Sequence, residues 1–164
     1  ITSGCGGGVT YDDPEIGIEP FQDHIRVEPG QLQWGFKHLQ SKDSLYARAR
    51  GVHAAGLFDP LQDRMLLVEE DIGRHNTIDK IRGGSAFLEI PTAGNVLLST
   101  GRISSEMLRK AAVMGCPVVA SRTSPTSLAV EFARAWGITL VGYVRHGKMR
   151  VYSFPERLGA ADQL

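Results

Sequence analysis

One of the two cysteines of this chain, Cys5, lies in the stretch SGCGGG (residues 3–8), where its neighbours offer no side chains to pack against. A thiolate is a strong nucleophile, and glycines leave it accessible and its backbone free to move. We therefore expect Cys5 to be a reactive thiol in a poorly ordered segment. Cys116, which precedes the apolar stretch PVVAS, is expected to be a buried structural cysteine. Counting alone leaves a single bridge between the two open.

Three stretches place an arginine beside small polar residues where an apolar stretch gives way to a helical pattern: EDIGRHN (70–76), STGRISSE (99–106) and SRTSPTS (121–127). Guanidinium groups suit phosphate oxygens, and helix N-termini beyond the carboxyl ends of parallel strands favour anions. Taken alone, each stretch is more simply explained as ordinary helix capping. Their recurrence at three adjacent strand ends favours a phosphate-bearing ligand. The candidate binding residues are Arg74, His75, Asn76, Gly101, Arg102, Ser104, Arg122 and Ser127.

The histidines do not indicate a metal site. His53 lies inside the apolar stretch GVHAAG and is expected to be a core histidine, whereas His75, near Asp71 and Asp79, is the better candidate for a polar site. A zinc deaminase keeps a glutamate two residues after its histidine and a Pro-Cys-x-x-Cys motif. The stretches GVHAA and CPVV match neither. We expect no zinc or other bound metal.

Strand-like and helix-like patterns alternate along the chain. Strands are predicted over 51–59, 64–72, 95–100, 117–122, 138–145 and 149–154, and helices over 31–40, 73–89, 103–115 and 127–137, with Gly115 and Gly137 ending the last two helices. Strands alternating with helices of this length favour the α/β class, with a mostly parallel sheet covered on both faces.

Length and composition indicate one domain. The chain has 164 residues, of which 42% are hydrophobic, and we divide it into a glycine-rich lead-in (1–30) and an α/β ligand-binding body (31–164). Lys and Arg (18) balance Asp and Glu (18), so no net charge is available to attract nucleic acid or an anionic membrane. With no leader and no long apolar run, we expect a cytoplasmic protein. Because residue 1 is Ile rather than Met, we expect an upstream region to be missing.

Several motifs in order resemble the formate dehydrogenase accessory protein family, the sulfur carriers that activate molybdenum-dependent formate dehydrogenases. The motifs are GVHAAGLFD, EDIGRHNTIDKI, TGRISSEMLRKAA, PVVASRTSPTSLAVEFA and VGYVRHGKMRVYSFPERL. The resemblance runs from SGCGGG almost to the end, and covers the larger, C-terminal part of a family member. It implies a three-layer α/β/α, cytidine-deaminase-like fold with a mostly parallel mixed sheet.

The resemblance also implies a sulfurtransferase activity. A cysteine desulfurase would pass sulfur to a cysteine of this chain as a persulfide, and the sulfur would move on to the molybdenum of the bis(molybdopterin guanine dinucleotide) cofactor required by formate dehydrogenase. Cys5 matches the first cysteine of the family's Cys-x-x-Cys motif, whereas the second position is Gly8. Because a resolving thiol is then absent, we expect Cys5 to carry the persulfide alone.

The cofactor's guanine dinucleotide arms would use the arginine-bearing stretches, so a GDP-like nucleotide is an expected ligand. The family's cofactor-contacting segment matches Tyr143, Val144, Arg145, His146, Gly147 and Lys148, a segment that its own pattern predicts to be a hairpin. The expected partners are a cysteine desulfurase and formate dehydrogenase, and a homodimer is left open. Two alternatives remain: a zinc-dependent nucleoside deaminase, and a chaperone that binds guanine nucleotide or molybdenum cofactor without transferring sulfur.

Overall fold

The computed structural model describes residues 17–41, 43–49 and 51–159. All six expected strands and all four expected helices are present among them, together with a short helix, α2, that the sequence pattern does not predict. The strands are β1 (His53–Asp59), β2 (Arg64–Asp71), β3 (Val96–Ser99), β4 (Val118–Ser121), β5 (Thr139–Arg145) and β6 (Lys148–Ser153). The helices are α1 (Pro29–Leu39), α2 (Leu45–Ala49), α3 (Arg74–Phe87), α4 (Ser105–Val113), α5 (Ser127–Ala135) and the 3-10 turn η1 (Pro155–Arg157).

The strands form one mixed sheet in the order β2-β1-β3-β4-β5-β6. The α/β class is confirmed, but the parallel part is smaller than the sequence pattern indicates: β3, β4 and β5 are parallel, whereas β1 is antiparallel to both β2 and β3, and β6 is antiparallel to β5. Tight turns join β1 to β2 and β5 to β6, and such turns permit only antiparallel neighbours. Helix α3 then crosses over β1 to place β3 on its far side.

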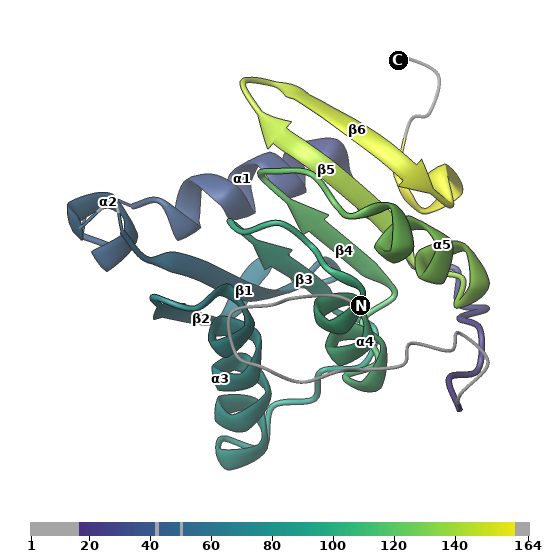
Figure 1. Ribbon diagram of the computed structural model, residues 1–164, viewed down its shortest axis with the longest axis horizontal. Coiled ribbons are helices and arrows are strands. Elements are labelled where there is room, and N and C mark those ends of the chain that lie inside the picture. Colours follow the sequence, from purple (N-terminus) through teal and green to yellow (C-terminus); the bar gives the residue numbers. More distant parts are fainter. Residues whose placement is uncertain (1–16, 42, 50, 160–164) are drawn as a thin grey trace.

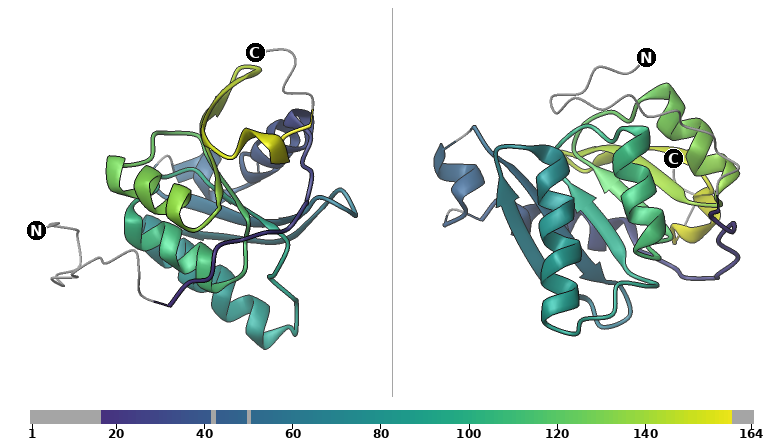
Figure 2. Two further views of the ribbon diagram at one scale, coloured as in Figure 1. Left: turned by 90° about the vertical axis from the view of Figure 1, so that its right-hand side faces the viewer. Right: turned by 60° about the horizontal axis from the view of Figure 1, so that its bottom comes forward.

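Helices cover both faces of the sheet, as expected for three layers. Helices α3, α4 and α5 cover one face and α1 covers the other (Figures 1 and 2). Successive strand residues point to opposite faces. In β3, Leu97 belongs to the apolar cluster under α3, α4 and α5, whereas Val96 and Leu98 belong to the cluster under α1. None of the described helices is long and apolar enough to cross a membrane.

Local signals set the ends of α4 and α5. Ser104 Oγ accepts a hydrogen bond from Met107 N (3.3 Å) at the start of α4, and Thr126 Oγ1 accepts one from Ala129 N at the start of α5. Beyond the helix ends, Gly115 (φ 75°) and Gly137 (φ 66°) adopt the left-handed conformation that favours glycine. Both predicted helix stops are confirmed.

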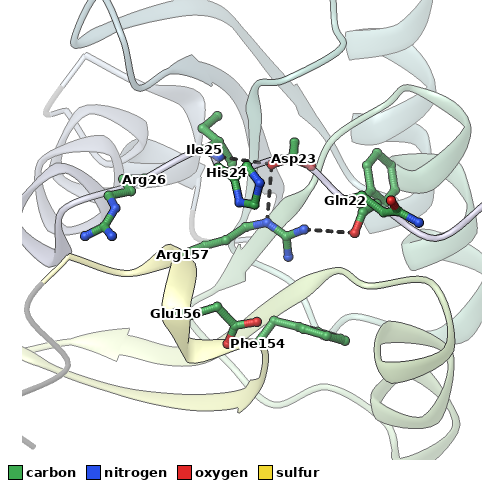
Figure 3. Close-up of a pocket in the computed structure, with 9 residues that line it drawn as sticks. Gln22, Asp23, His24, Ile25, Arg26, Phe154, Glu156 and Arg157 are labelled. Atoms are coloured by element: carbon green, nitrogen blue, oxygen red, sulfur yellow. Dashed lines mark hydrogen bonds and ion pairs between the residues drawn. The ribbon is translucent and has the colours of Figure 1, made fainter.

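The segment that precedes α1 packs against the body through Arg157. This side chain comes from η1, is 5% exposed, and donates hydrogen bonds to Phe21 O (3.2 Å), Gly137 O (2.6 Å) and Asp23 Oδ1 (3.3 Å; Figure 3). Val27 is fully buried in the cluster under α1. The described part of the expected lead-in therefore shares the core of the body. An open cavity of about 350 Å³ lies beside the Arg157 contacts.

Candidate anion-binding site at one edge of the sheet

The strand register brings four strand ends to one edge of the sheet, which we call the site edge. His53, at the start of β1, is opposite Asp71 at the end of β2, and Ser99 at the end of β3 is opposite Ser121 at the end of β4. The three arginine-bearing stretches follow β2, β3 and β4, so they all begin at this edge. The sequence pattern predicts that the three stretches follow three neighbouring strands. This prediction is wrong for β2 and β3, because β1 lies between them.

His53 occupies this intervening position, and the expectation that it is a core histidine is wrong. It is half-buried at the first residue of β1, and its ring makes no hydrogen bond within the described part of the chain. Burial, together with the positive charge of Arg74, holds the pKa of His53 below its usual value. His53 therefore lies at the rim of the site edge in a setting that favours the neutral imidazole over the imidazolium.

Gly101, in the loop that follows β3, lies against the first residues of α3 and β1. A Cβ at this buried position would lie 2.8 Å from Arg74 Cβ, 3.2 Å from Arg74 Cδ and 3.3 Å from His53 Nδ1. A real Cβ does not approach other heavy atoms within 3.0 Å, so an alanine would displace the Arg74 side chain. The absence of a side chain at Gly101 thus lets Arg74 lie across the loop that follows β3 and approach His53.

Arg74 is the first residue of α3, and its half-buried side chain has no anionic partner among the described residues. Its Nε atom is buried and has no hydrogen-bond partner there. Helix α3 has no side-chain cap and no acidic residue in its first turn, so the positive end of its dipole adds to the charge of Arg74. An unpaired guanidinium at a helix N-terminus favours the binding of an anion.

His75 is held by the neighbouring helix α4. Its Nε2 atom lies 3.1 Å from Ser104 Oγ and 4.0 Å from Glu106 Oε2. Burial lowers the pKa of His75 below its usual value, Glu106 and Asp79 oppose this effect, and Arg74 and Lys110 add to it. Ser104 thus has two roles, because its hydroxyl group both caps α4 and orients His75.

Asp71 organises the turn between β2 and α3. Its Oδ1 accepts hydrogen bonds from Gly73 N (2.9 Å) and from Asn76 Nδ2 (3.0 Å), and its Oδ2 lies 3.0 Å from Lys80 Nζ. The bonds from Gly73, Lys80 and Asn76 lower the pKa of Asp71 to about 2. The Asn76 amide is therefore engaged in shaping this turn.

Small polar residues at the strand ends, which the sequence reasoning did not select, hold the loops in place. Ser121 Oγ donates to Gly101 O (2.7 Å) and accepts from Thr123 N (3.0 Å), while Thr100 Oγ1 accepts from Ala54 N (2.9 Å). Each of these residues ends or directly follows an apolar strand. A polar residue at the end of a buried strand is the signal in the sequence that could have identified them.

The other predicted residues of the arginine-bearing stretches differ in exposure. Arg102 is exposed and Arg122 is half-buried, with Arg122 N bonded to Ser99 O (3.1 Å). Ser127 is exposed in the first turn of α5, where Thr126 supplies the cap instead. The side chains of Arg102 and Ser127 therefore face solvent at the site edge.

Residues 143–148 form the predicted hairpin. The turn His146-Gly147 has φ values of 52° and 74°, as in the two-residue turns that suit antiparallel hairpins, and Tyr143 also has a positive φ of 55°. The guanidinium of Arg145 lies 5.5 Å from the centre of the Tyr143 ring. Val144 is buried in the cluster under α1, so its side chain supports the hairpin from within. Strand β5 continues past the last residue of β4 before it turns at this hairpin.

Of the two cysteines, Cys116 is described and Cys5 is not. Cys116 is fully buried, and burial raises its pKa to about 12, which confirms the expected structural role. Cys5 and the rest of SGCGGG lie outside the described residues, and so does the expectation that this segment is poorly ordered. Within residues 17–41, 43–49 and 51–159, no group of three or more His, Cys, Asp and Glu side chains is arranged to hold a metal ion.

Together these features define a class of protein: a three-layer α/β/α protein whose sheet edge presents arginine, histidine and hydroxyl groups suited to an anionic ligand. The chain matches the FdhD/NarQ family over residues 1–159 and belongs to that family. The match includes Cys5 and the whole of the site edge.

Similar proteins agree with this assignment. The chain is 38% identical over 138 residues to the sulfur carrier protein FdhD of Staphylococcus haemolyticus, covering 84% of this chain and 52% of the relative. It is 45% identical over 115 residues to the sulfur carrier protein FdhD of Thermoplasma acidophilum, covering 70% and 40%. A crystal structure from Desulfotalea psychrophila, of a protein classed as a formate dehydrogenase accessory protein, matches with a TM-score of 0.78 at 32% identity, covering 87% of this chain and 60% of that one. The chain spans about half the length of the curated relatives it matches.

Proposed function

We propose that this chain is part of a sulfur carrier that serves formate dehydrogenase, with Cys5 as the sulfur-bearing residue. The observation that carries the proposal is the family match over residues 1–159, which includes the glycine-flanked Cys5, together with relatives described as sulfur carrier proteins. Cys116 is unsuited to this role, because a fully buried thiol with a raised pKa forms little thiolate.

The proposed chemistry begins with a persulfide on a cysteine desulfurase. The Cys5 thiolate attacks the terminal sulfur of that persulfide, the S–S bond of the donor breaks, and the donor cysteine leaves as a thiolate. Cys5 then bears the persulfide. In the second step the terminal sulfur moves to the molybdenum of the cofactor, the metal supplies the two electrons, and Cys5 is released as a thiolate. No second cysteine is needed, which accommodates Gly8 in place of the second cysteine of the motif.

The site edge would bind the bis(molybdopterin guanine dinucleotide) as a substrate. Its pyrophosphate groups require cations in a partly desolvated setting, and Arg74 offers a half-buried guanidinium without a described anionic partner. Arg102 and Arg122 follow the neighbouring strands β3 and β4. Tyr143, near the end of β5, offers an aromatic face close to the hairpin turn, with Arg145 beside it. The site edge therefore suits a long anionic ligand with aromatic ends, of which GDP is a simple fragment.

The test is to incubate the full-length protein with a cysteine desulfurase and free cysteine, and to measure the mass of the peptide that contains Cys5. One added sulfur atom on Cys5, absent in Cys5→Ser and retained in Cys116→Ala, is the expected result. A sulfur on Cys116 instead, or none on either cysteine, would refute the assignment of the carrier cysteine.

The second candidate is a chaperone that binds guanine nucleotide or molybdenum cofactor without transferring sulfur. It is favoured by Gly8, because the second thiol of the family motif is missing. On this hypothesis Cys5→Ser would still support formate dehydrogenase activation. Activation that depends on Cys5 therefore excludes the chaperone, whereas zinc in the purified protein would instead favour a deaminase.

A further inference from the structure

We propose that His53 and Arg74 together bind a phosphate group of the ligand, and that the His53 ring takes up a proton as the phosphate binds. This inference rests on the proposed function of the site edge and adds to it a binding residue, a phosphate position and a pH dependence. The ligand class is a nucleoside diphosphate or another pyrophosphate-bearing molecule.

The geometry places the two side chains around one point. Arg74 is the first residue of α3 and His53 is the first residue of β1, and α3 packs on the face of the sheet that includes β1. Both side chains approach the position where Gly101 would carry a Cβ, at 2.8 Å for Arg74 Cβ and 3.3 Å for His53 Nδ1. They therefore flank the same short stretch of backbone, and the charge of Arg74 is near enough to His53 to lower its pKa.

The nearby carboxylates are engaged elsewhere. Asp71 pairs with Lys80 and bonds to the turn before α3, while Glu106 lies beside Lys110 and His75. No described carboxylate pairs with Arg74, and no described residue bonds to the His53 ring. A cation and a neutral imidazole then share a corner at the positive end of α3, and an added anion would balance their charge.

The expected proton uptake by the His53 ring follows from the charges that face it. In the free protein, burial and Arg74 keep the pKa of His53 below its usual value, so the neutral form of the ring is favoured. A phosphate between the two side chains offsets the charge of Arg74 and favours the imidazolium, which raises the pKa of His53. Because the complex then binds more protons than the free protein, affinity rises as the pH falls between the two pKa values and is lost as the pH rises.

His75 is the neighbouring histidine that could be confused with His53. It faces Glu106, Asp79, Lys110 and Arg74, and its Nε2 is bonded to Ser104 Oγ. These partners are present before any ligand binds. We therefore expect the pKa of His75 to change less than that of His53 when phosphate binds.

The experiment is calorimetric titration of the full-length protein with GDP, and separately with inorganic pyrophosphate, in two buffers of different ionisation enthalpy. The parent should take up a proton with either probe, and its affinity should fall as the pH rises from the His53 pKa of the free protein towards that of the complex, by at most about tenfold per pH unit. His53→Gln should bind GDP roughly tenfold more weakly at the lower pH and show a flatter pH profile. His38→Gln is the matched control, because His38 stacks on Trp34 on the opposite face of the sheet.

Further measurements separate the possible failures. NMR titration of the His53 ring in the unmodified protein should show a higher pKa with saturating pyrophosphate, which tests the proposal even if the variant fails to fold. An unchanged His53 pKa, or parent affinity and proton uptake in His53→Gln, overturns the role of His53. If Arg74→Ala still loses affinity in that case, the anion site of the proposed function stands. If the parent binds neither probe, both the inference and the cofactor-binding part of the proposed function fail.

Discussion

The buried guanidinium of Arg157 should contribute strongly to stability, because it joins parts of the chain that are distant in sequence. It is 5% exposed and donates to Gly137 O at 2.6 Å, to Phe21 O at 3.2 Å and to Asp23 Oδ1 at 3.3 Å. Arg157→Ala would leave two carbonyl groups and one carboxylate without these donors. Breaking a buried ion pair costs about 3–5 kcal/mol. Because Asp23 is partly exposed and can be solvated, we expect a loss near the lower end, about 3 kcal/mol.

The assay is urea denaturation of the full-length protein by circular dichroism, with the free energy of unfolding extrapolated to water. A loss of about 3 kcal/mol corresponds to a fall in Tm of roughly 6–12 °C for a chain of this size. Arg157→Lys keeps the charge but not the planar fork, so its stability should lie between those of the parent and the alanine variant. Arg82→Ala, on the exposed side of α3, should lie within about 0.5 kcal/mol of the parent. If Arg157→Ala lost less than about 1 kcal/mol, the assigned structural role would be refuted.

Three further predictions address the carrier, the site edge and the acid response. Cys5→Ser should abolish both the persulfide and formate dehydrogenase activation while leaving GDP affinity unchanged, whereas Arg102→Ala should weaken GDP by about ten- to a hundredfold while persulfide loading continues. Unchanged GDP affinity in Arg102→Ala would assign that residue no part in binding. Gly101→Ala should cost about 1–3 kcal/mol of stability and weaken the binding of GDP, since its Cβ would lie 2.8 Å from Arg74 Cβ. Gly83→Ala is the control: this position in α3 has open space around it, so the alanine should stabilise the protein by about 0.5–1 kcal/mol. Equal stability of the two variants in urea would contradict the packing argument. The native hydrogen bonds of Asp71 lower its pKa from 3.8 to about 2, so its stabilising contribution is present above the pKa of the unfolded state and is lost as the pH falls through the pKa of the folded state. Asp71→Asn should therefore lose less stability than the parent over that acid range. Parallel curves of stability against pH for the two proteins would contradict this role of Asp71.

Much of the local structure could be predicted from neighbouring residues. Ser104, Gly115 and Gly137 mark the start or end of a helix through contacts within one turn, and they do so in the structure as expected. The hairpin turn at His146-Gly147 is similarly local. Helix α2 was missed because its five residues include no buried side chain and thus no apolar period. Its N-terminus is instead held by Glu70 of β2, which accepts hydrogen bonds from Leu45 N and Tyr46 N, a contact that sequence pattern does not show.

The candidate site was only partly predictable. Arg74 was recognised because an arginine at the start of a helix has a local meaning, and Gly101 because a glycine in the loop before a helix allows a tight turn or a close backbone approach. His53 was misread, since an isolated histidine in an apolar stretch looks the same whether it lies in the core or at a strand end. The decisive fact is that β1 lies between β2 and β3, which brings His53 to the edge that holds Arg74.

The sequence by itself therefore determined the six strands and four longer helices, the glycine stops of two of those helices, the exceptional setting of Cys5 and the resemblance to one family, because these depend on residue types a few positions apart. Tertiary structure decided the order of the strands, the meeting of His53 with Arg74 at Gly101, and the contact of Arg157 with Phe21 across 136 positions of the chain. The physical reason is that strand neighbours and buried ion pairs are selected by the packing of the whole core, where many pairings compete and one arrangement buries the apolar faces together.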